Sequence, residues 1–253
     1  MTVKDIYERF EEQIPKELSE PWDNDGLMCC SDSQVEVKKA IITLDVTEYV
    51  VDYAIEMGVD LIVSHHPLIF KPLTSIREDN HVSRKVIKLI ENGVSVMSFH
   101  TRLDKVSGGV NDQLCQALGI EDAVPFGEGD LGRIGYIPLE RPLDSFAIHV
   151  KKCLDADVIR VSDALNSVHH VAVVGGDGKS YVKDAIALGA DTYISGRIGY
   201  NVMEEAAEMG INLIEAGHYF TEQPITVYLG DLLHSFDTNI SIDIISSNQI
   251  KHF

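Results

Sequence analysis

Six side chains of this 253-residue chain have the types and the spacing of metal ligands. Two histidines are adjacent, and two others are each followed four residues later by an acidic residue. Imidazole and carboxylate groups without thiolate suit Zn, Mn, Fe, Co or Ni in a catalytic rather than a structural site. Each histidine taken alone could instead have a structural, hydrogen-bonded role. It is the six residues taken together that indicate a metal site. The six residues are His65, His66, His100, Asp104, His218 and Glu222.

The number of candidate ligands favours two metal ions. Neighbouring side chains of an extended chain point to opposite sides, so we expect His65 and His66 to bind different ions. Five or six ligands exceed the needs of one tetrahedral ion, whereas two ions sharing a bridging carboxylate would use them. Glu222, which has a long side chain with two oxygens, is the expected bridge. Such a pair of ions acidifies a shared water for hydrolysis.

Short apolar strands that alternate with helices must position these residues. Strand, helix, strand, helix, strand implies a parallel sheet with right-handed crossovers, whose ligand-binding loops follow the carboxyl ends of the strands. The second strand delivers His65 and His66, and the third delivers His100. The expected strands are residues 40–44, 61–63 and 94–98, and the expected helices are residues 47–57 and 81–92.

The second half of the chain resembles the first. Residues 54–66 (AIEMGVDLIVSHH) align without a gap with residues 185–197 (AIALGADTYISGR). Further on, the pair His100 and Asp104 corresponds to the pair His218 and Glu222, with one inserted residue. Chance similarity between two strand-helix-strand units is the alternative, but the preserved pair favours an internal duplication.

The fold class that follows is α/β, with two related α/β domains from this duplication enclosing a dinuclear metal site. The expected domains are residues 1–125 and 126–253, joined through an acidic, glycine-rich linker at 121–133. Equivalent strand ends in two facing halves would then converge on one cleft. The remaining expected elements are helices at 3–18, 110–118, 143–154 and 220–235 and strands at 134–137, 158–161, 171–175 and 240–245.

Composition indicates a soluble cytoplasmic protein. Forty acidic and 21 basic residues give a formal charge of −19, which works against nucleic-acid and anionic-membrane binding. No apolar run approaches the roughly 18 residues of a membrane span, and no signal segment is evident at the start. Four cysteines without CxxC spacing fit a reducing compartment. Cys29 and Cys30 are expected to be packing residues.

Several other features have two interpretations each. The segment 21–26 (PWDNDG) is expected to be a solvated loop pinned by one aromatic residue. Arg197 either faces a substrate phosphate or lies on the surface, and His169 and His170 are expected at a strand edge on the surface. The glycine run at 175–180 could cradle an anion or form a tight turn, but it is not a P-loop.

Seven motifs in order along nearly the whole chain resemble the Nif-three-like family, whose members are often labelled GTP cyclohydrolase 1 type 2 homologues. The resemblance implies two related α/β domains around a two-metal site, commonly in a ring-shaped homohexamer. By position, the family's metal ligands fall on His65, His66, Asp104, His218 and Glu222, with His100 lining the site. Asp25 stands where a small apolar residue is more usual. The motifs are PWDNDGL, SHHPLIF, HTRLD, GGVN, GRIG, GGDG and GHYFTE.

The leading hypothesis is therefore a metal-dependent hydrolase that binds two divalent ions, with His100 as general acid or base. A small molecule, either a nucleotide or another phosphoester, would be its substrate. The alternative from another class is a non-catalytic scaffold, in which the ions are structural or cargo and the protein binds a partner.

Overall fold

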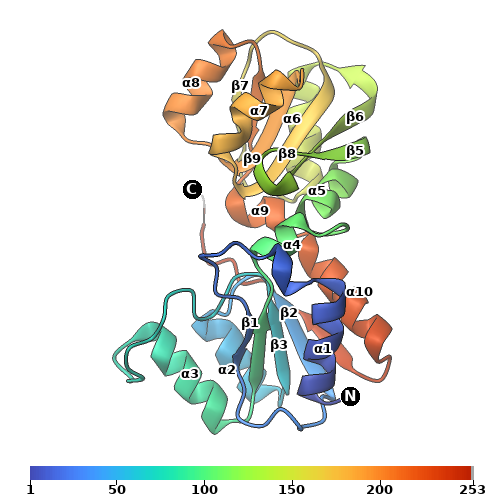
Figure 1. Ribbon diagram of the computed structural model, residues 1–253. Helices are drawn as coiled ribbons and strands as arrows, with labels where there is room; N and C mark the ends of the chain where they lie inside the picture. Colours follow the sequence, from blue (N-terminus) through green and yellow to red (C-terminus); the bar gives the residue numbers. More distant parts are fainter. Residues whose placement is uncertain (252–253) are drawn as a thin grey trace. The chain divides into compact units, whose positions relative to one another are not determined.

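A five-stranded sheet forms the centre of the first of two units in this computed structural model, which describes residues 1–251 (Figure 1). Unit 1 comprises Met1–Val106 and Thr226–Gln249. The strand order is β1-β4-β3-β2-β11, with β1 antiparallel to β4 and all other neighbours parallel. The strands are β1 (Gly26–Cys29), β2 (Lys39–Thr43), β3 (Leu61–Ser64), β4 (Ser95–Ser98) and β11 (Ser241–Ile244).

Helices cover both faces of this sheet. On one face, α2 and α3 pack their apolar sides against Ile41, Ile62 and Val96. On the other, Phe10 of α1 contacts Phe99 and Phe236, with ring centroids 4.8 and 5.1 Å apart. The helices are α1 (Val3–Gln13), the 3-10 turn η1 (Lys16–Leu18), α2 (Glu48–Glu56), α3 (His81–Glu91), α4 (Thr101–Lys105) and α10 (Ile225–Phe236).

A six-stranded sheet forms the centre of unit 2, residues Ser107–Ile225, to which Ile250 and Lys251 also belong. Its order is β5-β6-β8-β9-β10-β7, in which β8, β9 and β10 are parallel and the other pairs antiparallel. The strands are β5 (Glu121–Phe126), β6 (Gly132–Arg141), β7 (Arg160–Ser162), β8 (Val168–Asp177), β9 (Thr192–Arg197) and β10 (Asn212–Glu215).

Two apolar cores lie on the two faces of the second sheet. One includes Leu114 of α5 and Phe146 of α6, and the other includes Val182 of α7 and Met203 of α8. The helices are α5 (Val110–Leu118), η2 (Glu128–Asp130), α6 (Leu143–Cys153), η3 (Lys179–Tyr181), α7 (Val182–Ala187), α8 (Tyr200–Glu208) and α9 (His218–Glu222).

The predicted linker at 121–133 is corrected by the structure. Residues Glu121–Phe126 form β5, which pairs antiparallel with β6 inside unit 2. Because β5 is an edge strand with mostly exposed side chains, its polar composition resembles that of a connecting segment. The division expected after residue 125 thus falls within unit 2, and the last predicted strand, found as β11, pairs with β2 of unit 1.

The two units share an order of connections. In each, three strands run parallel in chain order (β2, β3, β4 and β8, β9, β10), and the strand before them pairs antiparallel with the third. A shared order of strands is what the alignment of residues 54–66 with residues 185–197 predicts. The internal duplication itself stays a prediction. No helix among residues 1–251 is long and apolar enough to cross a membrane.

Candidate metal centre

Three histidines meet at the carboxyl edge of the first sheet. His65 and His66 follow β3, and His100 follows β4, the parallel neighbour that pairs Ser98 with Ser64. Ring nitrogens of the three lie within 4.8 Å of one another, and their ring centroids are 4.8 to 5.6 Å apart. Parallel neighbours end at the same edge, so the loops after β3 and β4 bring these residues together. We call His65, His66 and His100 the histidine cluster.

Every ring of the histidine cluster is oriented through its Nδ1 atom. The partners are the Phe99 carbonyl for His65 (2.9 Å), an Asp45 carboxylate oxygen for His66 (2.8 Å) and an Asp23 carboxylate oxygen for His100 (2.9 Å). These oxygens can only accept, so Nδ1 donates, and a neutral imidazole then has its lone pair on Nε2. Metal-binding histidines are generally fixed in this way.

Asp104 lies close to the same cluster. Its Oδ1 atom, on α4, is 3.6 Å from Nε2 of His65, which is fully buried. Two ligands of one tetrahedral ion, with bonds of about 2.0–2.2 Å, are about 3.4 Å apart. The spacing of Asp104 and His65 therefore fits two ligands of a single ion.

In unit 2, His218 and Glu222 occupy the two ends of the short helix α9. Nε2 of His218 lies 3.1 Å from Oε2 of Glu222 in this i,i+4 pair. The Glu222 side chain is 6% exposed, whereas that of His218 is 46% exposed. A buried carboxylate beside an accessible imidazole is a donor pair suited to a divalent cation. We refer to it as the His218–Glu222 pair.

Part of the glycine run at 175–180 makes room for this pair. A Cβ atom on Gly176, whose φ is +66°, would lie 2.3 Å from Oε1 of Glu222 and 3.2 Å from Nε2 of His218. The amide of Gly175 donates to Asn111 Oδ1 (2.8 Å) and that of Gly176 to Thr221 Oγ1 (3.1 Å). Because these amides already donate to side chains, the structure favours the turn over an anion cradle.

Replacing Gly176 with alanine should therefore destabilise the protein by more than backbone strain alone would. Gly210 is a matched control, because its φ is +78° and a Cβ there would meet nothing within 4 Å. We expect Gly210→Ala to cost about 1 kcal/mol of unfolding free energy. Gly176→Ala should cost about 1–2 kcal/mol more and shift Glu222, which weakens metal binding. Urea unfolding and metal titration of both variants test this, and equal behaviour would contradict it.

The loop before β1 supplies two buried acids that sequence reasoning did not identify. Trp22 is 63% exposed, whereas the side chains of Asp23 and Asp25 are fully buried. The expected solvated loop pinned by its aromatic residue is thus wrong: the aspartates anchor it. Asp23 accepts from His100 and from both the amide and the hydroxyl of Thr101, at 3.0 and 2.6 Å. The PWDNDGL and HTRLD motifs are linked by these bonds.

These hydrogen bonds determine the charge of Asp23. Burial raises the pKa of Asp23, but hydrogen bonds from His100 and Thr101 outweigh burial and hold the pKa well below its usual 3.8. A carboxylate with a lowered pKa stabilises the fold above the unfolded-state pKa, and this contribution is lost as the pH falls through the folded-state pKa.

The corresponding variant is Asp23→Asn. We expect it to lower the unfolding free energy by about 1–3 kcal/mol at pH 7, because charged hydrogen bonds are replaced. Below about pH 4 the Asp23 carboxylate takes up a proton in the unfolded wild-type chain but not in the folded one, so the wild type loses stability and the difference should shrink. Urea unfolding at pH 7, 5 and 3 measures this, and a difference that is the same at pH 7 and pH 3 would refute it.

Other candidate residues lie outside these clusters. Arg197 is exposed at the end of β9, and His169 is exposed in β8, while His170 stacks on Tyr136 with centroids 4.4 Å apart. All four cysteines are free thiols. Burial raises the pKa of Cys29 to about 11 and that of Cys115 to about 12, which fits packing rather than redox chemistry.

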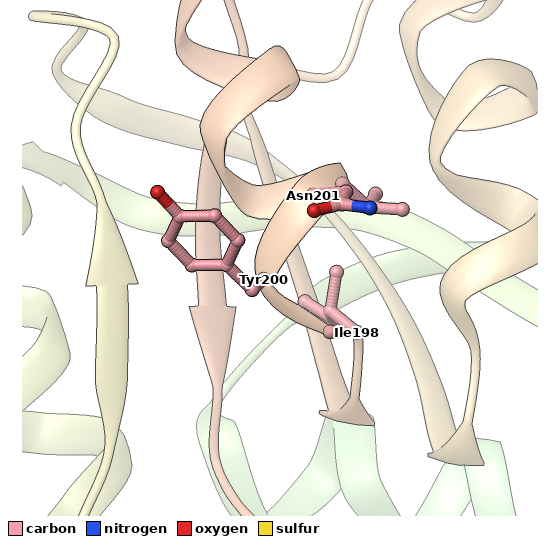
Figure 2. A pocket seen from close by; sticks show the side chains of 5 residues that line it. Ile198, Tyr200 and Asn201 are labelled. Atoms are coloured by element: carbon pink, nitrogen blue, oxygen red, sulfur yellow. The ribbon is translucent and has the colours of Figure 1, made fainter.

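A cavity of about 300 Å³ lies in unit 2 at the start of α8 (Figure 2). Its neighbour Glu215 accepts from the amides of Ile198 (2.7 Å) and Gly199 (3.0 Å) and pairs with Arg160. The carboxylate is thus used to hold the loop before α8. The cavity is lined by Ile198, Gly199, Tyr200, Asn201 and Val202, which include no metal-binding side chain.

Relatives of known name match nearly the whole chain. Proteins named GTP cyclohydrolase 1 type 2 homolog include one from Clostridium perfringens, 35% identical over 238 residues that cover 91% of this chain and 90% of the relative. Another, from Clostridium acetobutylicum, is 32% identical over 265 residues, and the match covers 100% of this chain and 98% of the relative.

Solved structures share the fold. A Bacillus cereus protein related to NIF3 matches with a TM-score of 0.88 at 26% identity, covering 100% of this chain and 99% of that one. Reduced HcgD from Methanocaldococcus jannaschii matches with a TM-score of 0.82 at 30% identity over 97% of both chains. A sequence profile of the family described as Duf34/NIF3 (NGG1p interacting factor 3) matches residues 1–252. This chain therefore belongs to the Duf34/NIF3 family.

Proposed function

We propose that this protein is a metal-dependent hydrolase that binds two divalent ions through His65, His66, Asp104, His218 and Glu222. The observation that carries the proposal is the fixed orientation of the histidine cluster, in which all three Nδ1 atoms donate to oxygen acceptors. Structural histidines need no such common orientation, whereas metal ligands do.

The available side chains fit such ions. Nitrogen and oxygen donors without thiolate suit Zn, Mn, Fe, Co or Ni. The 3.6 Å spacing of His65 and Asp104 and the 3.1 Å spacing of His218 and Glu222 are both within the range of ligand pairs on one ion. When bound, the ions would supply Lewis acidity and activate water for attack on an electrophilic centre.

His100 is the proposed general acid or base. Its Nδ1 atom donates to the buried carboxylate of Asp23, so the ring is held in one orientation, as in a His–Asp pair of a hydrolase. Its side chain is 18% exposed, so a substrate can reach it. Nε2 of His100 could then take or give a proton during turnover.

The names of the relatives make GTP the first substrate to test. In a cyclohydrolase reaction, one water would add to C8 of the guanine ring and the C8–N9 bond would break, and a second water would hydrolyse the resulting formamide to release formate. Phosphoester hydrolysis would use the same donors. In a chain of net charge −19, a phosphate-bearing substrate needs local positive charge, which bound cations would provide.

The experiment is reloading of the metal-free protein with Zn, Mn or Fe, followed by metal analysis and turnover assays. We expect about two ions per chain and metal-dependent turnover of GTP or of a phosphodiester such as bis(p-nitrophenyl) phosphate. His100→Ala should retain metal and lose turnover. Fewer than about one ion per chain contradicts the two-metal site, and tight metal retention without turnover of any substrate favours the scaffold.

Two further proposals concern assembly, which rests on the family resemblance, and location, which rests on four cysteines without CxxC spacing. We propose that the protein assembles as a homohexamer and works in the cytoplasm. Light scattering during size-exclusion chromatography tests the assembly, where a mass of about one 28.0 kDa chain would contradict it.

A further inference from the structure

Two exposed aromatic side chains stand beside the histidine cluster. Trp22 is 63% exposed and Phe70 is 46% exposed, in loops before β1 and after β3. Their ring centroids are 6.2 Å apart at 76°. Both rings contact His100, with centroids at 6.4 Å for Trp22 and 6.0 Å for Phe70. A continuous aromatic surface therefore extends from His100 towards solvent.

Trp22 is exposed although its loop is fixed by hydrogen bonds. The next three residues are all tied by their side chains. Asp23 accepts from His100 and Thr101, and Asp25 accepts from Arg102. Asn24 donates to the carbonyl of Ile69, the residue before Phe70, which links the two loops. Trp22 is thus held outwards by an anchored segment and is pre-organised for contact.

Large aromatic side chains are usually buried, so two held at the surface beside a polar cluster require an explanation. Small-molecule sites typically combine aromatic walls with a few placed polar groups. A planar heteroaromatic ring stacks on such side chains, and a stacked base contributes about 1–3 kcal/mol in nucleic-acid complexes. An aliphatic phosphoester would gain little from them.

We propose that Trp22 and Phe70 bind the planar heteroaromatic ring of the substrate processed at the histidine cluster. This inference rests on the proposed function for the location of the reaction, and it deepens that function by naming the substrate class. Substrates would carry a ring such as a purine, and the aromatic pair would set specificity for it.

The test uses the fluorescence of Trp22, which is the sole tryptophan of the chain. Metal-free and Zn-loaded protein are titrated with guanosine and adenosine, and with ribose 5-phosphate as a probe that lacks the ring. We expect saturable changes with both nucleosides and none with ribose 5-phosphate. No response to either nucleoside, or an equal response to ribose 5-phosphate, would overturn the proposal.

The matched variants are Phe70→Leu and Tyr49→Leu. Tyr49 is 54% exposed in α2 of the same unit and makes a ring contact only with Tyr53 among the described residues. Phe70→Leu should weaken nucleoside binding about tenfold, as loss of one stacked ring would, while Tyr49→Leu should bind as the wild type. Equal binding by the two variants would refute the role of Phe70. Circular dichroism checks that both are folded.

Metal binding and ring binding are measured separately, so the two proposals can fail separately. If the protein fails to take up metal on reloading but still binds nucleosides saturably, the hydrolase proposal fails and the aromatic pair is supported. Full metal loading and turnover of bis(p-nitrophenyl) phosphate, with no fluorescence response to nucleosides, would support the hydrolase and contradict the role of the aromatic pair.

Discussion

Replacing Arg102 with methionine is expected to lower the free energy of unfolding by about 3–5 kcal/mol, because it removes one partner of a buried charge network. The Arg102 side chain is fully buried. Its Nε donates to Asp25 (3.1 Å), and its Nη1 donates to Glu11 (2.6 Å) and to the carbonyl of Ile14 (2.9 Å). Methionine fills part of the space but removes one of the two cationic partners of the buried carboxylate of Asp25, which keeps Lys16, and it leaves the Ile14 carbonyl without its donor.

Urea unfolding followed by Trp22 fluorescence measures this loss in unit 1, where the only tryptophan lies. The control is the double variant Asp25→Ala with Arg102→Met, which removes both charges. It should be less destabilised than the sum of the single variants, since the bond between Arg102 and Asp25, which each single variant removes, is lost only once. Additive effects, or a loss below about 1 kcal/mol for Arg102→Met, would contradict the argument.

Replacing His65 with alanine is expected to weaken metal binding by more than about 100-fold. Changing a residue that only orients a metal ligand typically costs 10- to 100-fold, and removal of a ligand should cost more. His65 is fully buried, its Nδ1 is fixed by the Phe99 carbonyl, and its Nε2 lies 3.6 Å from Asp104. Competition with a chromophoric chelator measures the affinity, and elemental analysis gives the ions per chain.

The matched control is His169→Ala, since His169 is exposed on β8 and should leave metal content unchanged. His65→Ala also opens a cavity, so both variants are first compared by urea unfolding in the presence of chelator. If His65→Ala is less stable than wild type, His66→Ala provides a second ligand variant at a partly exposed position. Retention of two ions per chain by both ligand variants would rule out these residues as ligands.

Much of the fold could be predicted where periodicity is strong. The helix expected at 143–154 is α6 at 143–153, and the strands expected at 61–63 and 94–98 are β3 and β4. The helix expected at 3–18 ends at Gln13, because Pro15 interrupts it and residues 16–18 form a 3-10 turn. Local pattern determines these elements, so the sequence alone reveals them.

The clustering of His65, His66 and His100 was also accessible, because parallel strands must end at one edge. The residues that orient the cluster were not. Asp45 follows β2 at that same edge, and the parallel-sheet rule could have identified it. Asp23 and Asp25 lie on a loop whose path depends on Arg102 and Thr101, which are distant in sequence, and polar composition alone does not distinguish buried aspartates from solvated ones.

The pairing of β11 with β2 has a consequence for synthesis on the ribosome. Strand β2 is complete by Thr43, but its edge stays open until residues Ser241–Ile244 emerge, about 200 residues later. At about 5–20 residues per second, that edge waits roughly 10–40 s for its partner. Residues 107–225 can fold as a continuous segment during this interval. The histidine cluster therefore belongs to the unit that is finished last, so a nascent chain would acquire the strands of its second sheet before its first sheet is complete.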